Sequence, residues 1–301
     1  MAIMRTGFSD LFFQDALPVL ENLVMEKYQS YPDMIPQVFN VESSDRWGEQ
    51  STGITGFGLV PQKAENAPIA YDDFYQAYDK TYIHSTYSMG FRVSKEFIDD
   101  EKWGVIRKAA QSLGRSMFNT RQISAASVFN GGFADTGPDG QPLFSASHPL
   151  IGGGVASNTL SVPADFSVLS LRQALNNMED TVDDRGLLLN IKPKFLLIPN
   201  ELKWDAEEIL KSSLKPDTAE NAINAFQMVG LEYMVWNYLT DPDAWFLVGE
   251  KGDHSIKWYE RESVNVDSDV DWEASASKTK IRNRFSYGYD EFRGVFGVAG
   301  A

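Results

Sequence analysis

The sequence predicts an α+β fold built around one unusually long helix. Residues 103–130 contain no proline, are rich in Ala, Arg, Gln and Ser, and run into Asn130-Gly131-Gly132. A helix of this length would span on the order of 40 Å, well beyond the mean of about 11 residues in globular proteins. Two further observations support this class. Residues 46–78 form a glycine-rich stretch without a core of its own, and residues 165–213 read as helix, strand and helix.

Composition limits the kinds of protein that this chain can be. With 301 residues, 43% apolar and 23% charged, the chain can bury a sizeable core. The absence of cysteine excludes disulfides, thiolate metal sites and cysteine nucleophiles. The formal charge of −15 makes the average surface repel nucleic acids and anionic membranes. No apolar run reaches the ~18 residues of a membrane span, and the first residues lack the apolar region of a signal peptide.

The first segment, over residues 6–31, is predicted to be an amphipathic helix. It could pack on its own domain or act as a terminal arm that docks on a neighbour, and both interpretations stay open. Tyr31 and Ile35 each precede a proline, so the helix should stop there. A short strand is expected over 38–41. Helical spacing is kept by Leu17, Leu20, Val24 and Tyr28.

Residues 46–78 are predicted to form a long two-stranded arm. Glycines are interspersed with Ser, Thr and Gln, a polar tip follows over 62–68, and an extended pattern resumes up to Tyr78. Few of these residues could bury apolar area within one subunit. The spacing Gly53-x-x-Gly56-x-Gly58 matches neither nucleotide motif, and no lysine-serine pair follows it, so a phosphate-binding loop is not expected.

Residues 80–94 alternate in polarity and are predicted to be one long strand that leads into the long helix. Asp99 or Asp100 can cap that helix, with Glu101 in its first turn, where the helix dipole favours an anion. The helix should bury the stripe Ile106, Ala110, Leu113 and Met117 and expose Arg107, Lys108, Gln111 and Arg115.

The second half of the chain alternates helices and strands. A helix with its apolar face from Val168 to Val182 should close at Gly186, and a buried strand should follow over 194–199. Asn200 is then placed to cap a helix over 201–213. Further strands are expected over 231–239, 245–248, 256–259, 278–289 and 294–298.

A catalytic hypothesis depends on His148, which lies in the sequence Ser-Ala-Ser-His-Pro of the long loop after the helix. A hydrolase would need this histidine beside Ser145 or Ser147, oriented by a carboxylate such as Asp139. No Gly-x-Ser-x-Gly elbow occurs. Structural packing of the loop by His148 is therefore the favoured interpretation.

A metal site is not indicated. No His-Glu-x-x-His motif occurs. Asp267-x-Asp269-x-Asp271 begins like a calcium loop, but Trp272 replaces the turn glycine and Lys278 the final glutamate. A solvated acidic turn is expected there, with weak cation binding left open.

One basic run lies near the end of the sequence. It consists of Arg282, Arg284 and Arg293, with Lys278 and Lys280 close by. Strand-edge charge is the first interpretation of this run. A contact to a phosphate or to another subunit is the second.

The order of these parts resembles that of tailed-phage major capsid proteins. A glycine-rich arm, a strand, Ser94-Lys95-Glu96-Phe97-Ile98-Asp99-Asp100 and a long helix precede Phe129-Asn130-Gly131-Gly132-Phe133. The resemblance covers nearly the whole chain and is closest to the head subunits of Mu-like phages. Further matching segments, in order, are Asp139–Pro149, Asn158, Lys194–Pro199, Asn221–Asn224, Tyr238–Asp241 and Ala244–Leu247.

This resemblance implies the Hong Kong 97-type capsid fold, in which an arm, a loop and two domains interleave. The long helix would be the spine of a peripheral domain, and an axial domain would surround the capsomer symmetry axes. The implied division is an N-terminal arm over 1–45, an extended β-hairpin loop over 46–80, a peripheral domain over 81–164 joined by 261–290, and an axial domain over 165–260 joined by 291–301.

The implied function is shell assembly. Such proteins form hexamers and pentamers of an icosahedral shell around double-stranded DNA, which they hold without sequence specificity. They are not enzymes and use no cofactor. Scaffold, portal or decoration proteins would be further partners, and a membrane would not. The shell would be part of the virion, assembled in the cytoplasm of the bacterial host. An encapsulin-like compartment is the alternative of the same fold, and a hydrolase using His148 is the alternative of a different class.

Assembly contacts are expected on the arm and in the basic run. Apolar arm side chains would be buried on the spine region of a neighbour. Some relatives crosslink a loop lysine to an asparagine of a neighbour, and Lys63 occupies the corresponding loop. The candidate contact residues are Ile54, Phe57, Leu59, Lys63, Ile69, Arg282 and Arg284.

Overall fold

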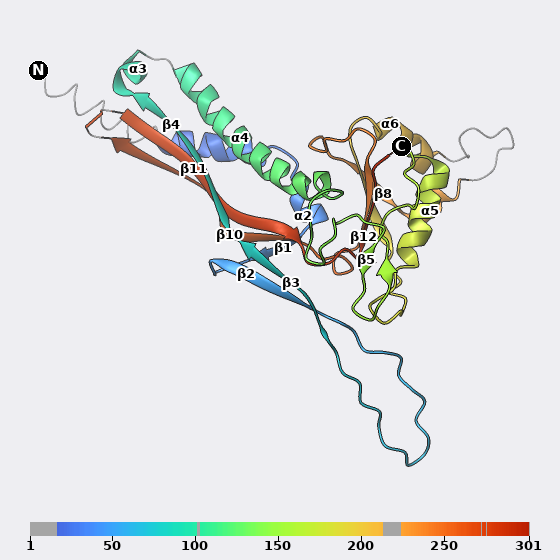
Figure 1. Ribbon diagram of the computed structural model, residues 1–301. Helices are drawn as coiled ribbons and strands as arrows, with labels where there is room; N and C mark the ends of the chain where they lie inside the picture. Colours follow the sequence, from blue (N-terminus) through green and yellow to red (C-terminus); the bar gives the residue numbers. More distant parts are fainter. Residues whose placement is uncertain (1–16, 101–102, 213–223, 272, 275, 301) are drawn as a thin grey trace, which may run out of the picture.

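The computed structural model describes residues 17–100, 103–212, 224–271, 273–274 and 276–300. Two four-stranded sheets and two two-stranded ribbons alternate with helices, as the α+β prediction requires (Figure 1). Among the described residues, no helix is long and apolar enough to cross a membrane. Residues 6–16, Glu101, Trp272 and the segment 213–223, for which the sequence also carried predictions, lie outside the described ranges.

The first sheet is long and carries the long helix on one face. Its strands, in spatial order, are β1 (Asn40–Ser43), β10 (Ile256–Asp271), β11 (Ala276–Tyr289) and β4 (Ser85–Ser94). β10 and β11 form an antiparallel hairpin, β4 pairs antiparallel with β11, and β1 runs parallel to the start of β10. Helix α4 (Trp103–Asn130) runs along this sheet (Figure 1).

The prediction for α4 is confirmed in both its bounds and its faces. Ile106, Ala110, Leu113 and Met117 are buried, and the four polar residues expected on the opposite face are exposed. The stripe packs on Ile281 of β11 and on Leu20 and Val24 of a helical segment over residues 17–29. A helix of 28 residues is covered because the β10–β11 hairpin beneath it is equally extended.

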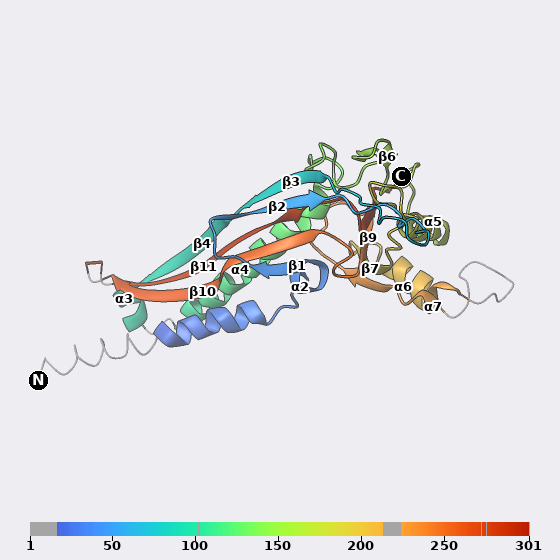
Figure 2. The same ribbon diagram turned by 90° about the horizontal axis from the view of Figure 1, so that it is seen from below.

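The helical segment 17–29 lies beside α4 (Figure 2). The two helices approach most closely at Gly114 of α4. A Cβ atom at this glycine would lie 2.3 Å from the carbonyl oxygen of Val24 and 3.2 Å from the amide nitrogen of Tyr28. Only a residue without a side chain allows the two backbones to approach this closely.

We expect Gly114→Ala to lower the free energy of unfolding by about 1–3 kcal/mol, because the added methyl group must push the two helices apart. Gly104→Ala in the same helix is the matched control, since its Cβ would meet nothing within 4 Å. That change should stabilise the helix by up to about 1 kcal/mol. Urea denaturation of both variants tests the contact, and shifts of the same sign would contradict it.

The second sheet is smaller and is buried on both faces. Its strands, in spatial order, are β12 (Val295–Val298), β9 (Trp245–Gly249), β7 (Pro193–Ile198) and β8 (Glu232–Val235). One face packs on helices α5 (Val168–Glu179) and α6 (Lys203–Lys211) and on the short α7 (Phe226–Val229).

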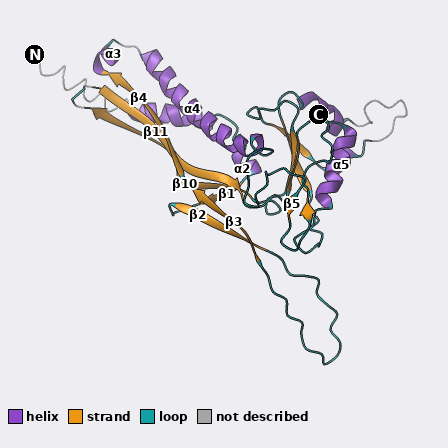
Figure 3. Cartoon of the chain, in the orientation of Figure 1, coloured by secondary structure: helices purple, strands orange, loops and turns teal. Residues whose placement is uncertain are grey.

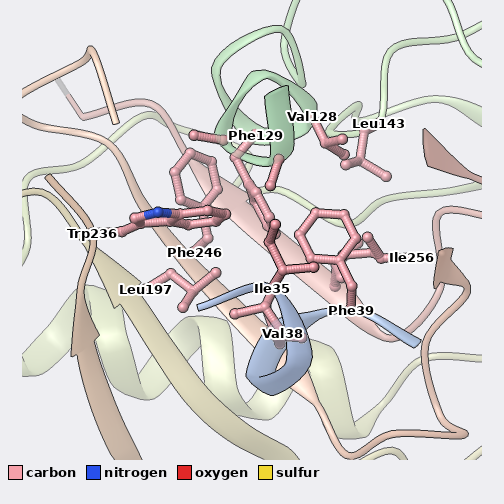
Figure 4. Packing of buried hydrophobic residues seen from close by; sticks show 14 of the residues in the cluster. Ile35, Val38, Phe39, Val128, Phe129, Leu143, Leu197, Trp236, Phe246 and Ile256 are labelled. Atoms are coloured by element: carbon pink, nitrogen blue, oxygen red, sulfur yellow. The ribbon is translucent and has the colours of Figure 1, made fainter. Parts of the chain in front are cut away.

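Alternate residues of these strands enter two different cores. Leu196 and Leu247 face the helices, whereas Leu197 and Phe246 enter a central cluster. The cluster also holds Phe129 at the end of α4, Ile256 of β10, and Ile35 and Val38 of α2 (Ile35–Val38), and so joins the two sheets (Figure 4).

The predicted arm is present and consists of β2 (Gly48–Ile54) paired antiparallel with β3 (Gln76–Ile83). Residues 55–75 continue beyond the ribbon as a tip without strands (Figure 3). We call β2, β3 and this tip the arm. Its long axis points away from both sheets (Figure 1).

The prediction of one strand over 80–94 was wrong. The chain breaks at His84, so that β3 belongs to the arm and β4 to the first sheet, and the short helix α3 (Lys95–Asp99) follows. The His84 ring is buried, with Nε2 3.0 Å from Oγ of Ser44 and Nδ1 2.9 Å from Oγ of Ser286. Alternation continues on both sides of the break, so periodicity could not reveal the change of partner strand.

The acidic turn predicted at Asp267–Asp271 was also wrong. These residues lie in β10, which extends far beyond the predicted 256–259, and they oppose the lysines of β11. Oδ2 of Asp267 lies 3.4 Å from Nζ of Lys280, and Oδ2 of Asp271 lies 2.5 Å from Nζ of Lys278. Cross-strand ion pairs let a strand carry this many charges.

Several predicted boundaries also differ. The helix expected to close at Gly186 is α5, which ends at Glu179, and the strand expected over 231–239 is the shorter β8. Pro36 occupies the first turn of α2 instead of ending a helix, because a helix start needs no proline N–H. The strand expected over 38–41 is β1, but it begins only at Asn40 and ends at Ser43, because Val38 belongs to α2. Asn200 is not the cap of α6, which begins at Lys203 after Leu202 without a side-chain cap.

His254, in the turn before β10, makes folding sensitive to acid. Burial, and secondarily the charge of Lys251, lowers its pKa from 6.5 to about 4. Nδ1 accepts the N–H of Ile256 at 3.3 Å, which needs the neutral ring. Because the folded pKa is the lower one, stability is complete above about pH 6.5 and falls as the pH drops toward 4.

We therefore expect the free energy of unfolding to fall by about 3 kcal/mol between pH 6.5 and pH 4, because His254 binds a proton in the unfolded chain but not in the folded one. His254→Asn keeps an acceptor near Nδ1 but does not titrate. In urea denaturation at several pH values, the wild type should lose more stability than this variant as the pH falls. Parallel curves for the two proteins would show that His254 does not contribute.

Candidate functional site: the arm and its attachment

The arm exposes large apolar side chains that have no cover within the subunit. Leu59 is 81% exposed, Val60 93% and Tyr71 94%. An apolar surface of this kind indicates a contact with another molecule. Large apolar side chains of the arm that are more than half exposed are Ile54, Phe57, Leu59, Val60, Ile69, Tyr71, Phe74, Tyr75 and Ile83.

The structure therefore places four predicted contact residues, Ile54, Phe57, Leu59 and Ile69, on one exposed element. Lys63 lies exposed in the tip between them. The prediction left out Val60 and Tyr71, which are the most exposed of the set. The same signal, apolar residues in a segment without a core, would have found both.

The base of the arm is fixed to the body by Asp290, just after β11. Ser51 of β2 donates to its Oδ2 at 2.7 Å, and Tyr82 of β3 donates to its Oδ1 at 2.5 Å. Nζ of Lys257 in β10 lies 2.8 Å from Oδ2. One carboxylate thus holds both strands of the arm on the first sheet.

The pKa shifts of Tyr82 and Lys257 support this attachment. Burial, and next the charge of Asp290, raises the pKa of Tyr82, so its hydroxyl stays a donor. Burial alone would lower the pKa of Lys257, but the hydrogen bond to Asp290 and the nearby negative charges, that of Asp290 first, together raise it. Tyr82 and Lys257 therefore stay hydrogen-bond donors across the neutral range.

Arg282 and Arg284 lie on β11 and are separate from the exposed tip. They alternate with Ile281, Asn283 and Phe285, which are buried toward α4, so the arginines lie on the opposite face of the sheet. Nε of Arg282 lies 3.1 Å from Oε2 of Glu262 on β10. Arg282 is thus paired within its own sheet, but β11 lies between β10 and β4, so the predicted strand-edge position was wrong.

The contacts of His148 are those of a residue that packs its loop. Its ring is buried, with Nδ1 2.5 Å from Oδ2 of Asp139 and Nε2 3.1 Å from Oδ1 of Asn158. The ring stacks on Phe292 with centroids 3.8 Å apart. Burial would raise the pKa of Asp139, but the hydrogen bond from His148 lowers it.

Both ring nitrogens of His148 are engaged, and neither is held by a serine. Oγ of Ser145 lies 3.5 Å from Gln141 and from Ser147 instead. His148 also starts the small ribbon of β5 (His148–Pro149) and β6 (Val155–Ala156). The described residues thus do not assemble the hydrolase arrangement, and they contain no group of His, Asp or Glu that could hold a metal ion.

A family model described as phage capsid protein matches residues 77–298. This chain belongs to the phage capsid protein family. As a member it is a structural protein of the virion shell, in which copies associate with one another, and it is not an enzyme. The matched region begins inside β3, so the family match does not include the tip of the arm.

Solved capsid structures share the fold of this capsid protein. Microbacterium phage Oxtober96 is 14% identical, with 90% of this chain and 93% of that chain covered and a TM-score of 0.53. The Bacteriophage JBD30 capsid is 15% identical, with 70% and 92% covered and a TM-score of 0.56. The capsid of Myoviridae phage XM1 is 11% identical, with 89% and 92% covered and a TM-score of 0.53.

These similarities confirm the predicted capsid fold, while the Mu-like subgroup stays a prediction. No curated protein matches the sequence. The family match favours a phage shell over an encapsulin-like compartment or a hydrolase.

Proposed function

We propose that this capsid protein forms hexamers and pentamers that close into an icosahedral shell around double-stranded DNA. The arm of each subunit would dock on a neighbour in the shell. The observation that carries this proposal is that the arm exposes several large apolar side chains within one short segment and contributes none of its tip residues to the three buried clusters.

Docking of the arm would supply much of the association energy. Full burial of a large apolar side chain contributes about 1.5–3 kcal/mol. Leu59, Val60 and Tyr71 would together offset part of the cost of association. Because every subunit gives one arm and receives another, the same contact repeats around a closed ring.

The division into parts follows the same proposal. The peripheral domain, 81–164 with 261–290, would hold α4 and most of the first sheet, and the axial domain, 165–260 with 291–301, most of the second. The N-terminal arm would be 1–45 and the extended loop 46–80. Lys63, Arg282 and Arg284 would be further subunit contacts.

The net charge of −15 suits a shell that encloses DNA without binding it tightly or recognising its sequence. Assembly in the bacterial cytoplasm, with scaffold, portal or decoration proteins as partners, belongs to this proposal.

Electron microscopy of the purified protein is the direct test. We expect closed shells of uniform size, with five-fold and six-fold capsomers, at micromolar concentration. Particles purified from the host should contain nuclease-protected double-stranded DNA. A single small particle in solution would contradict the proposal, and shells that enclose a protein cargo in place of DNA would favour the encapsulin-like alternative.

A further inference from the structure

A second contact between the arm and the body lies far from the Asp290 node. Nη1 of Arg185 lies 2.6 Å from Oδ2 of Asp72 in the tip, and Nη2 donates to the carbonyl oxygen of Asp73. The guanidinium carbon lies 5.8 Å from the centre of the Tyr75 ring. Asp72 also accepts the N–H of Gly58 at 2.8 Å, so this carboxylate joins both sides of the tip to Arg185.

The turn that carries Arg185 is organised locally. Oδ1 of Asp183 accepts the N–H groups of Arg185 and Leu187, both at 2.8 Å, and Gly186 has a φ of +80° that suits glycine. Leu188, at the end of this turn, is 66% exposed. Polar contacts fix the turn to the body: Nε of Arg293 donates to the carbonyl oxygen of Val182 at 2.9 Å, and Nη2 of Arg293 lies 3.2 Å from Oδ1 of Asp184. The turn is therefore a fixed support from which Arg185 contacts the arm.

Between the Asp290 node and Arg185 the arm contacts the body through the Tyr78 hydroxyl, which donates to the carbonyl oxygen of Pro149 at 3.3 Å. Ile54 and Gly56 of the arm line an open cavity of about 360 Å³, whose other wall includes Asp184, Ile191 and Ser255. Apolar packing thus does not fix the arm at this level. Its direction depends on polar contacts at the base, at Tyr78 and at Arg185.

We propose that Arg185 is a positioning residue for assembly: it braces the arm in the direction from which the tip docks on a neighbouring subunit. The inference rests on the proposed docking of the arm. An autoinhibitory contact would bury the docking surface, but here Leu59, Val60 and Tyr71 stay more than 80% exposed while Arg185 holds Asp72. The brace thus orients the apolar surface without covering it.

The physical effect of the brace is entropic. A tip without strands, attached only at its base, would sample many directions, and docking would have to order it. The side chains of Arg185 and Asp72 are 21% and 48% exposed, so salt weakens their attraction. The hydrogen bond from Arg185, followed by that from Gly58, lowers the pKa of Asp72, which keeps the carboxylate charged near neutral pH.

The direction of the arm can be measured directly because the chain contains no cysteine. Cysteines introduced at Glu65 in the tip and Asn177 on α5 would carry two spin labels, for distance measurement in the unassembled subunit. We expect one narrow distance distribution in the otherwise unchanged protein and a broad one after Arg185→Ala. Arg172→Ala, an exposed arginine on α5, is the matched control and should leave the distribution narrow.

Assembly provides the second readout. Light scattering should show that Arg185→Ala raises the protein concentration needed for shell formation by roughly 10-fold. Arg185→Lys, which keeps the charge but loses the planar fork, should lie between wild type and Arg185→Ala. High salt should bring the wild-type threshold toward that of Arg185→Ala. Melting temperatures should stay unchanged, since the contact is exposed.

The brace is overturned if Arg185→Ala matches Arg172→Ala in either the distance distribution or the assembly threshold. Failure of arm docking itself would give a different result, namely normal shells from a protein whose arm has been shortened. A shortened-arm protein that cannot assemble, together with wild-type behaviour of Arg185→Ala, would reject the brace alone.

Discussion

Deletion of Gly53–Ala70 should abolish shell assembly and leave a folded subunit. The deleted residues include most of the exposed apolar tip and none of the three buried clusters. β2 would end at Thr52 and β3 would begin at Gln76, with a five-residue turn between them, which is a common hairpin length. Negative-stain microscopy and sedimentation would show subunits or small oligomers in place of shells.

A gentler change tests the same surface. Replacing Leu59, Val60 and Tyr71 by serine should raise the assembly threshold by roughly 100-fold, from the apolar burial that is lost. Val162→Ser is the matched control, since this valine is 71% exposed but lies outside the arm. Normal-sized shells from the deletion, or an unchanged threshold for the serine variant, would show that the arm is not the docking element.

The second large effect concerns stability and lies beneath α4. Arg121 is buried and donates to both carboxylate oxygens of Glu260, at 2.7 and 3.2 Å, and to Oδ1 of Asn283 at 3.0 Å. Asn283 donates in turn to Glu260 at 3.0 Å, and Trp258 lies under the guanidinium. Burial would lower the pKa of Arg121, but the hydrogen bond to Glu260 and the nearby negative charges, that of Glu260 first, together raise it.

Arg121→Leu should lower the free energy of unfolding by about 3–5 kcal/mol, because it leaves the Glu260 carboxylate without its charged partner. Arg115→Leu, exposed on the same helix, should change stability by less than about 0.5 kcal/mol. The double variant Arg121→Leu, Glu260→Leu should recover part of the loss, since no buried charge is then left alone. A loss below about 1 kcal/mol in urea denaturation of Arg121→Leu would contradict this account.

Elements with a strong local signal could be predicted from the sequence. The bounds of α4 follow from the absence of proline and from the glycines after Asn130, and its buried stripe follows from the helical period. The arm was recognisable for the opposite reason, since residues 46–78 contain too little that could be buried within one subunit. Both signals come from neighbouring residues along the chain.

The candidate site was predicted in part for the same reason. The exposed positions Ile54, Phe57, Leu59 and Ile69 could be named because a segment without a core must leave its apolar residues uncovered. The break at His84 could not, because β3 and β4 share one alternating pattern and differ only in the strands with which they pair.

The sequence by itself thus determined the long helix and the unsupported arm, because both depend on the pattern of neighbouring residues. It also determined the order of strands and helices and the likeness to capsid proteins, because both depend on the order of segments along the chain. Only the tertiary structure decided which distant polar groups meet. Asp290 holds Ser51, Glu260 pairs with Arg121, and Arg185 braces Asp72 across separations of 239, 139 and 113 residues. The physical reason is that a side-chain contact depends on where the folded backbone brings two groups, and no local period records that position.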